Sequence, residues 1–518
     1  MYKEVDIRVV PEHAEDKAFI LKVLSRKARI PKENISDFQL LKRSIDARGA
    51  QPLYALRYRV YHENEKSDTN VSELERYALL PNNSPVVIIV GAGPAGYFAA
   101  LECIANGLKP IVLERGKDVQ TRRKDLRAIQ QDGIVNPNSN YCFGEGGAGT
   151  YSDGKLYTRS HKRGSIEGVL KTFVAHGATK DILIDAHPHI GSNKLPKIVQ
   201  NLRNTIEENG GEVIFETKVI DFIIKNDQMK GVISENGEYQ GESVILATGH
   251  SARDIFDICK RYNLGLEFKP FAVGVRIEHP QSLVDSIQYN KAQRGQHLPA
   301  ASYRLACQYN NVGVFSFCMC PGGLIVPAAT APEELVVNGM SLSKRDSPFA
   351  NAGTVITVDE NNIPGFQNTF SGLEFQKKLE RKVFVDGDGS QKAPAQRLTD
   401  FVKGRVSSTL GDTSYIPGIY SSDFKQMLPS FIYDSLAFAV KQFDRKMKGY
   451  FTEDAHVIGL ESRTSSPLKL PRDRVTYMHD RIEGLYPCGE GAGYAGGILS
   501  AAMDGQNVAK AIAKRITN

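Results

Sequence analysis

The hydrophobic pattern is clearest at residues 86–114, where two short apolar runs flank a glycine-rich turn. Val86–Val90 is an uninterrupted apolar run, mostly β-branched, which predicts a strand buried on both faces of a parallel sheet. The run leads directly into Gly91-Ala-Gly-Pro-Ala-Gly96 and then into an Ala-rich stretch with helical spacing. A second apolar run, Ile111–Leu113, ends at Glu114. This order predicts a strand, a tight turn, a helix and a second strand.

The three glycines of this turn have separate physical roles. Gly91 permits a tight turn, Gly93 lets the backbone approach a pyrophosphate, and Gly96 lets the helix pack closely on the strand. The phosphate is expected at the positive N-terminus of the helix. An acid roughly 20 residues past the last glycine is expected to accept hydrogen bonds from an adenosine ribose. The predicted nucleotide contacts are Gly91, Gly93, Pro94, Ala95, Gly96, Glu114 and Arg115.

The rest of the pattern divides the chain into five segments. Residues 1–62 predict a small α+β module, and residues 63–84 are polar, end in Pro-Asn-Asn-Ser-Pro and predict a linker. Residues 85–263 carry the nucleotide unit, residues 264–477 predict a largely antiparallel substrate domain, and residues 478–518 return to the first domain. The predicted fold is α/β: a Rossmann-like domain with an inserted, largely antiparallel domain and a small N-terminal α+β module.

A second glycine-rich stretch covers residues 144–154. Each glycine carries an entropic cost on folding, so a backbone that wraps closely around a ligand would explain so many of them. A mobile surface loop is the alternative. The predicted contacts here and at the nearby strand ends are Gly146, Gly147, Gly149, Thr150, Ser152, Lys155, Val219, Ala247, Thr248 and Gly249.

The composition of the chain limits the kinds of binding partner that we expect. A hydrophobic content of 41% and a charged content of 24% are ordinary for a globular protein. The net charge of +6 is spread along the chain, so we expect no nucleic-acid partner. We see neither a membrane-spanning run nor a leader, and seven scattered cysteines do not suggest a disulfide framework. We therefore expect a cytoplasmic protein with a small-molecule substrate and no membrane partner; the oligomeric state stays open.

Three separated segments resemble the nucleotide-binding parts of FAD-dependent oxidoreductases of the glutathione reductase and p-hydroxybenzoate hydroxylase type. They are Gly91–Glu114, Ala247-Thr-Gly249, and Gly489-Glu490 with Gly496-Gly497. In such proteins the terminal acid contacts the ribityl and pyrophosphate region, and the next helix points its N-terminus at the flavin. A helix N-terminus suits the negative charge that a reduced flavin gains. The resemblance implies that Gly489 and Glu490 take the place of the Gly-acid pair and that Gly496, Gly497 and Ile498 lie under the flavin ring.

Four other stretches resemble a bacterial family of uncharacterised FAD-dependent, NAD(FAD)-utilising dehydrogenases. They are Phe143–Leu156, Cys318–Gly323, Asn338–Ser341 and Glu461–Pro467. The resemblance covers essentially the whole chain and implies bound FAD, but it brings no substrate. Only one GxGxxG unit is present, so we do not expect tightly held NAD. NAD(P)H as a transient co-substrate stays open.

Three basic residues are candidate catalytic groups: Lys155, Arg345 and Arg463. Each could stabilise negative charge or position an anionic substrate, and ordinary salt bridges are the alternative. Cys318 and Cys320 form a Cys-x-Cys pair whose spacing strains a disulfide. We interpret them as buried strand cysteines, with a substrate-facing or redox role as the alternative. No metal site is predicted, because no further ligand accompanies them.

The sequence favours an FAD-dependent oxidoreductase, a dehydrogenase that transfers a hydride between an unidentified small substrate and flavin N5. One alternative is an FAD-containing binding or sensing protein whose N-terminal module recognises a macromolecular partner. A flavin monooxygenase is a further alternative, weakened because Thr248 stands where those hydroxylases often carry an acid. A halogenase with a tryptophan-containing signature is excluded, since the chain has no tryptophan.

Overall fold

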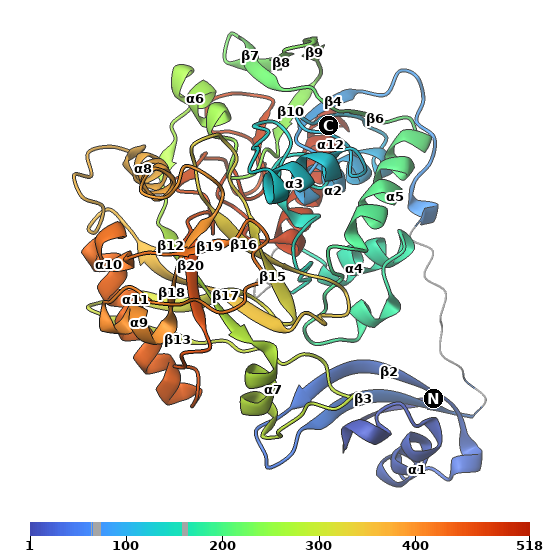
Figure 1. Cartoon of the computed structure of the whole chain (residues 1–518). Helices are drawn as coiled ribbons and strands as arrows, with labels where there is room; N and C mark the ends of the chain where they lie inside the picture. The colour runs from blue at the N-terminus through green and yellow to red at the C-terminus, as the bar shows by residue number, and fades with distance from the viewer. Residues whose placement is uncertain (64, 66–73, 158–163, 518) are drawn as a thin grey trace.

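The computed structural model describes residues 1–63, 65, 74–157 and 164–517 (Figure 1). Part of the expected 63–84 linker therefore lies outside the described residues. The predicted fold class is confirmed: a parallel sheet with helices against it is combined with a largely antiparallel sheet and a small N-terminal α+β unit.

The parallel sheet positions the glycine-rich turn. Its strand order is β22-β10-β4-β5-β6, and every neighbouring pair is parallel. The strands are β4 (Val86–Val90), β5 (Lys109–Leu113), β6 (Glu212–Ile214), β10 (Ser243–Leu246) and β22 (Leu485–Pro487). The helices that accompany them are α2 (Pro94–Ala105), α3 (Arg122–Gln131), α4 (Ile166–Ala175), α5 (Leu195–Glu208), α6 (Arg253–Arg261) and α12 (Ile498–Thr517).

The central strand β4 is buried on both faces, which explains its uninterrupted apolar run. Val87 and Ile89 pack into the core that α2, α5 and α12 share. Ile88 and Val90 point to the other face, where they meet α6 and a three-stranded antiparallel sheet. That sheet consists of β7 (Val219–Lys225), β8 (Gln228–Ser234) and β9 (Gly237–Gln240).

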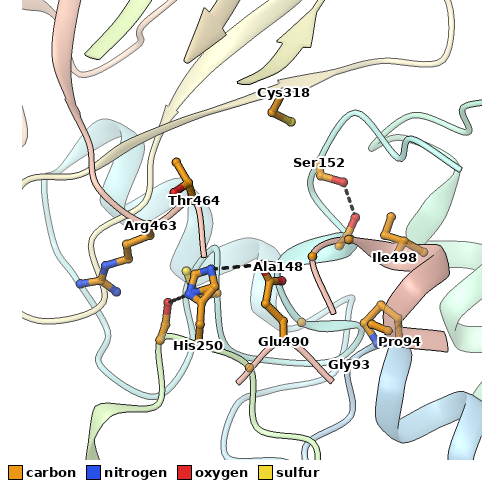
Figure 2. Close-up of a pocket in the computed structure, with 18 of the residues that line it drawn as sticks. Gly93, Pro94, Ala148, Ser152, His250, Cys318, Arg463, Thr464, Glu490 and Ile498 are labelled. Atoms are coloured by element: carbon orange, nitrogen blue, oxygen red, sulfur yellow. Dashed lines mark hydrogen bonds and ion pairs between the residues drawn. The ribbon is translucent and has the colours of Figure 1, made fainter. Parts of the chain in front are cut away.

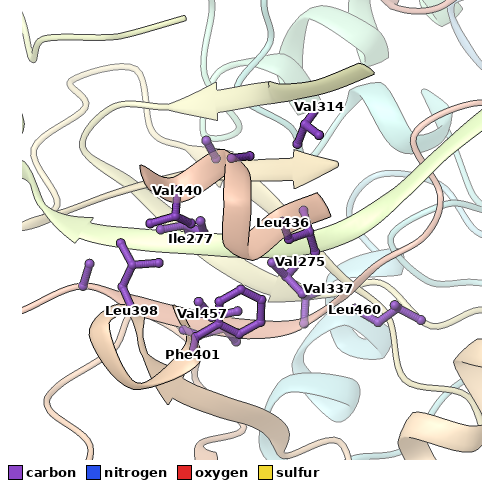
Figure 3. Close-up of a cluster of buried hydrophobic side chains, with 14 of the residues drawn as sticks. Val275, Ile277, Val314, Val337, Leu398, Phe401, Leu436, Val440, Val457 and Leu460 are labelled. Atoms are coloured by element: carbon purple, nitrogen blue, oxygen red, sulfur yellow. The ribbon is translucent and has the colours of Figure 1, made fainter. Parts of the chain in front are cut away.

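The second large sheet has seven strands in the order β13-β14-β17-β12-β20-β18-β19, and all neighbours are antiparallel except β18 and β19. Its strands are β12 (Phe271–Pro280), β13 (Ala306–Tyr309), β14 (Val312–Cys320), β17 (Phe349–Val358), β18 (Ala393–Arg397), β19 (Ile419–Ser421) and β20 (His456–Glu461). Figure 3 shows Leu436 and Val440 of α11 (Ser430–Lys446) beside Val275 and Ile277 of β12, within the largest buried cluster.

Smaller elements complete this half of the molecule. Two short antiparallel pairs are β11 (Glu267–Phe268) with β21 (Leu468–Lys469), and β15 (Gly323–Pro327) with β16 (Val337–Ser341). The helices are α7 (Gln281–Tyr289), α8 (Ser371–Val385), α9 (Leu398–Lys403) and α10 (Phe424–Met427). Within the described residues, no helix combines the length and apolar character that crossing a membrane needs.

The N-terminal unit is a three-stranded antiparallel sheet, β1-β3-β2, with α1 packed on one face. Its elements are β1 (Tyr2–Val9), α1 (Lys17–Ala28), β2 (Ile35–Asp46) and β3 (Leu53–His62). It lies at the lower edge of the molecule in Figure 1. Both β2 and β3 contact the rest of the chain, and the Tyr54 hydroxyl of β3 donates to the His297 carbonyl at 3.0 Å. The Arg43 amide donates to the Ile184 carbonyl at 2.7 Å, and the Ala186 amide donates to the Arg43 carbonyl at 2.9 Å.

Candidate active site

A cavity of about 880 Å³ lies where the carboxyl ends of β4, β5 and β10 meet strands of the second half of the chain. In open α/β sheets the carboxyl ends of the strands are where ligands bind. Gly91, Glu114 and Ala247 each directly follow one of these strands and line the cavity. Phe315–Met319 of β14 and Asn338 of β16 line the opposite side.

Four glycines leave a bare backbone path through the cavity. A Cβ atom on Gly93, Gly249, Gly496 or Gly497 would have no atom within 4 Å, and all four residues line the cavity. Gly93 is the N-cap of α2, and Gly497 directly precedes α12. Two helix N-termini therefore lie next to open space where the backbone carries no side chains. This arrangement suits the pyrophosphate of a dinucleotide, because a helix N-terminus binds phosphate.

Gly91 and Gly96 pack the turn against its neighbours. Gly91 has φ +107°, and a Cβ there would lie 2.5 Å from the carbonyl oxygen of Ala247. A Cβ on Gly96 would lie 1.9 Å from the carbonyl oxygen of Gly91. Gly96 therefore does not line the cavity, and its lack of a side chain brings α2 close to the strand end.

Glu114 joins three backbone segments. Its Oε2 accepts from the Ala92 amide at 2.9 Å, and its Oε1 accepts from the amides of Gly116 and Gly144, each at 2.9 Å. The side chain is 5% exposed and lines the cavity. Because a carboxylate oxygen has two lone pairs, Oε2 keeps an acceptor position for a ligand hydroxyl. Sequence reasoning had given Glu114 only the ligand contact.

Four of the predicted cofactor contacts do not line the cavity: Gly96, Gly146, Thr150 and Gly489. A Cβ on Gly146 would lie 1.8 Å from the Thr150 hydroxyl, which itself donates to the Glu145 carbonyl at 2.9 Å. The Gly489 amide donates to Asp504 at 2.8 Å. The remaining predicted contacts all line the cavity: Gly91, Gly93, Pro94, Ala95, Glu114, Arg115, Gly147, Gly149, Ser152, Lys155, Val219, Ala247, Thr248, Gly249, Glu490, Gly496, Gly497 and Ile498.

Glu490 and His250 face each other in the cavity (Figure 2). The distance from His250 Nε2 to Glu490 Oε1 is 4.0 Å. Burial raises the pKa of Glu490 to about 7. Burial, together with the charge of Arg463, lowers the pKa of His250 to about 3, so the imidazole is neutral at pH 7. Sequence reasoning missed His250 because no spacing rule links it to Glu490, which is far away along the chain.

The three predicted catalytic residues occupy different places. Lys155 lines the cavity, with Nζ 3.7 Å from Asp153 and 3.6 Å from the sulfur of Cys318. Arg345 does not line the cavity; its Nε donates to Asp153 at 3.0 Å. Burial would raise the pKa of Asp153, but Lys155 and Arg345 outweigh it and lower that pKa to about 2. Arg345 thus binds the carboxylate that also contacts Lys155, and its catalytic role stays a prediction.

Arg463 lines the cavity but is held in an ion-pair cluster. Its guanidinium donates to Glu380 at 2.9 Å and to Glu334 at 2.7 Å, and Arg253 donates to the same two carboxylates. Figure 2 shows the guanidinium turned away from Glu490 and Ile498. The arrangement fits a buried structural cluster better than contact with a reacting substrate.

The Cys-x-Cys pair lies at the end of β14. Cys320 is completely buried, whereas Cys318 is only partly buried and lines the cavity. Aromatic and apolar side chains of the same region, also missed from the sequence, accompany it: Tyr303, Leu305, Phe315, Phe317 and Met319. Among the described residues, no group of three or more His, Cys, Asp or Glu side chains could hold a metal ion.

Comparison with protein families agrees with this geometry. Residues 86–122 match the model of an FAD binding domain, and residues 270–464 match a model described as "FAD-dependent protein, C-terminal domain-like". Residues 1–61 match a domain of unknown function. The chain is thus an FAD-binding protein with an oxidoreductase-type fold.

An uncharacterised protein of Clostridium beijerinckii is 39% identical over 518 residues, which is 97% of each chain. The chain belongs to the same family as this clostridial protein. A D-amino acid dehydrogenase of Helicobacter pylori is 32% identical over 68 residues, 13% of this chain and 16% of that one.

Two solved structures that match this chain are distant from it in sequence and have low TM-scores. The structure of CtdE in complex with FAD is 11% identical, with a TM-score of 0.34 over 84% of this chain and 89% of that one. The glycerol-3-phosphate dehydrogenase of Bacillus halodurans, complexed with FAD, is 10% identical, with a TM-score of 0.35 over 84% of this chain and 66% of that one.

Proposed function

We propose that the protein is an FAD-dependent dehydrogenase that transfers a hydride between a small organic substrate and the flavin. The observation that carries the proposal is the path of Gly93, Gly249, Gly496 and Gly497, along which no side chain fills the space next to the backbone. The finer placement in the glutathione reductase and p-hydroxybenzoate hydroxylase type rests on the motif resemblance alone.

The residues present fit FAD from end to end. Glu114 would accept hydrogen bonds from the adenosine ribose. The backbone at Gly93, the N-cap of α2, would hold the pyrophosphate. Gly496 and Gly497, before α12, would lie against the flavin ring. A bound flavin supplies N5 as the atom that accepts or releases a hydride.

Residues of the second half of the chain would position the substrate. Phe315 and Phe317 provide an apolar surface, while Lys155 provides a positive charge inside the cavity. Burial lowers the pKa of Lys155, but Cys318 and Asp153 outweigh it and raise that pKa, so the amine stays an ammonium ion. We therefore expect a substrate that joins an apolar part to an anionic or strongly polar group. Lys155 orients that group and does not remove a proton.

The test begins with the purified protein. We expect a yellow protein whose chromophore, released by denaturation, is FAD. Colourless protein that takes up no flavin would refute the proposal. Rapid mixing with NADH and with NADPH then asks whether a nicotinamide is the transient electron donor, and fast bleaching of the flavin absorbance by either would support this.

A second candidate function is an FAD-containing binding or sensing protein. The observation in its favour is that Arg43 of the N-terminal unit is hydrogen-bonded to residues 184–186. The same segment continues to His189, which forms a β-bridge with Lys155 in the cavity wall. Binding of a partner to the N-terminal unit would therefore be felt at the cavity. A flavin that is reduced neither by the two nicotinamides nor by a panel of metabolites would favour this candidate over the dehydrogenase.

A further inference from the structure

Cys318 has an unusual backbone for a strand residue. Its φ is +43°, in the left-handed region that a non-glycine residue rarely adopts. The pairing of β14 with β17 shifts register between Phe317 and Cys320, so Cys318 lies in a β-bulge. Bulges next to active sites commonly re-aim a side chain, and strained residues concentrate at functional sites. Here the result is that the Cys318 sulfur points into the cavity, toward the side where Ser152 lies (Figure 2).

The surroundings of Cys318 favour the thiolate. The hydrogen bond with Cys320 is the largest influence, and with the charges of Lys155 and Arg276 it holds the pKa of Cys318 well below its usual value, against the effect of burial. Asp153 acts in the opposite direction but is itself paired with Arg345. Arg276 is completely buried in β12 and binds Glu461 of β20 at 2.6 Å. Glu461, Glu490 and Tyr157 also interact electrostatically with Cys318.

Cys320 lies directly behind Cys318. Its sulfur is 3.3 Å from the carbonyl oxygen of Cys318, and it is completely buried. Burial and the hydrogen bond with Cys318 raise the pKa of Cys320 well above its usual value. One sulfur is thus accessible from the cavity and the other is protonated and shielded, which is the division between an attacking and a resolving thiol.

We propose that Cys318 and Cys320 form a dithiol centre in which Cys318 attacks a disulfide bound in the cavity and Cys320 resolves the product. The Cys318 thiolate bonds to one substrate sulfur, the substrate S–S bond breaks, and the first substrate sulfur leaves as a thiolate that takes a proton from water. Cys320 then gives up its proton to the second departing sulfur and bonds to Cys318. The substrate gains two electrons and two protons and becomes two thiols, while the pair is oxidised to a disulfide.

The return to the dithiol needs two electrons and two protons. This step rests on the proposed function and takes as its reductant a reduced nicotinamide, the class of electron donor that the rapid-mixing experiment tests. A disulfide between residues two positions apart is strained, and strain makes a disulfide easier to reduce. The tight spacing therefore suits a pair that cycles rather than a structural bridge.

The first experiment uses dithiobis(nitrobenzoate), an anionic aromatic disulfide whose product thiolate is coloured. We expect the wild-type protein to release one coloured thiolate rapidly and then a second as Cys320 resolves the mixed disulfide. Cys320→Ser should release only the first and keep the mixed disulfide on Cys318, visible by peptide mass spectrometry. Cys318→Ser should lose the rapid phase. Cys142→Ser is the matched control, because Cys142 lines the same cavity from another segment of the chain, and it should behave like the wild type.

A rapid phase that survives in Cys318→Ser would overturn the proposal. So would a wild-type protein in which no peptide links Cys318 to Cys320 after the reaction. FAD content is measured on the same preparations, so that failure of FAD binding, which sinks the proposed function, is distinguished from failure of the thiol chemistry.

The second experiment measures the rate of alkylation of Cys318 by iodoacetamide as a function of pH. We expect the rate in the wild type to stay high well below the ordinary thiol pKa. Lys155→Met should move the inflection upward by removing the nearby charge, and Lys155→Arg should restore it in part, which a merely structural role for Lys155 would not do. An ordinary thiol profile in the wild type would overturn the assignment of Cys318 as the attacking group.

Discussion

Single residues decide whether the cavity can hold FAD. Gly93 shows this directly, since the position of its missing Cβ is open space inside the cavity. Glu114 differs from Gly93 because its buried carboxylate accepts three backbone hydrogen bonds and so stabilises the fold. The same carboxylate is expected to contact the ligand. Substitutions at the two positions should therefore differ in their effect on the empty protein.

Gly93→Val is expected to abolish detectable FAD binding without destabilising the apoprotein. The added Cβ has no protein atom within 4 Å, and the side chain would occupy the space expected for the pyrophosphate. A tenfold loss of affinity corresponds to about 1.4 kcal/mol, and we expect at least that loss. Flavin fluorescence titration measures the loss of FAD affinity, and thermal unfolding of the apoprotein checks that its stability is unchanged. Gly49→Val, in the N-terminal unit, is the control and should bind FAD normally; normal binding by Gly93→Val would show that the phosphate site is misplaced.

Glu114→Ala is expected to destabilise the apoprotein by about 1–3 kcal/mol, because three buried amides lose their acceptor. It should also weaken FAD binding through the lost ribose contact. Urea unfolding measures the first effect, and titration of the folded variant with FAD measures the second. Glu235→Gln changes an exposed carboxylate and should alter neither. Unchanged stability of Glu114→Ala would contradict the joining role of this carboxylate.

Glu490 should give the apoprotein a recognisable pH dependence. Its pKa is raised from 4.5 to about 7, so the folded state favours the protonated form. Its contribution to stability is therefore fully present below about pH 4.5 and is lost as the pH rises through about 7. Glu490→Gln should remove this contribution to the pH dependence of the free energy of unfolding. The variant should therefore gain stability relative to the wild type between about pH 5 and pH 8. Urea unfolding at both pH values tests this, with Glu483→Gln, at an exposed carboxylate, as control. A constant difference between variant and wild type would contradict the raised pKa.

At the scale of elements, the pairing of α2 with α12 holds the two helix N-termini beside the cavity. Gly505 lies in α12, and a Cβ there would be 2.1 Å from the carbonyl oxygen of Ala95. Only a residue without a side chain allows this approach, so the spacing of the two helices depends on one glycine. The helices supply Gly93 and Ile498 at their starts, which couples their packing to the shape of the site.

Gly505→Ala is expected to push the two helices apart and to cost about 1–3 kcal/mol of stability, the usual range for overpacking. FAD affinity should fall together with stability, because the backbone at Gly93 and Gly497 moves. Urea unfolding and FAD titration test the coupling of the two effects. Lys514→Ala on the exposed side of α12 is the control. Loss of stability with unaltered FAD affinity would show that the cavity does not depend on this contact.

Much of the parallel-sheet half could be predicted from the sequence, because its signals are local. The apolar run of β4 predicts a strand buried on both faces, and the glycine turn follows it directly. The identities of the cavity residues on β14 could not be predicted, because a register shift decides that Cys318 points into the cavity while Cys320 is buried. Likewise, Arg345 pairs with Asp153, nearly two hundred positions earlier, and no spacing in the sequence indicates that contact.

At the scale of the whole molecule, the N-terminal unit is connected to the cavity wall by a short path. Arg43 of β2 binds Asp185 at 2.7 Å and also reaches Asp181. The chain then runs from Asp185 to His189, which forms an antiparallel bridge with Lys155. The side chain of Arg43 is 27% exposed, so its ion pairs are partly shielded from solvent and worth more than surface pairs. This geometry predicts that the unit steadies the segment that carries Lys155.

Arg43→Ala should therefore raise the rate of amide hydrogen exchange in residues 181–189 and weaken the attachment of the unit, with little change in the parallel sheet. The backbone hydrogen bonds of residue 43 survive the substitution, so we expect local loosening rather than detachment. Arg48→Ala is the matched control, because Arg48 forms its ion pair with Asp46, inside the unit, and its side chain is 85% exposed. Exchange in 181–189 that is equal in both variants would mean that the Arg43 ion pairs do not order the segment. Faster exchange that extends to Lys155 in Arg43→Ala alone would show that the N-terminal unit acts on the cavity through this path.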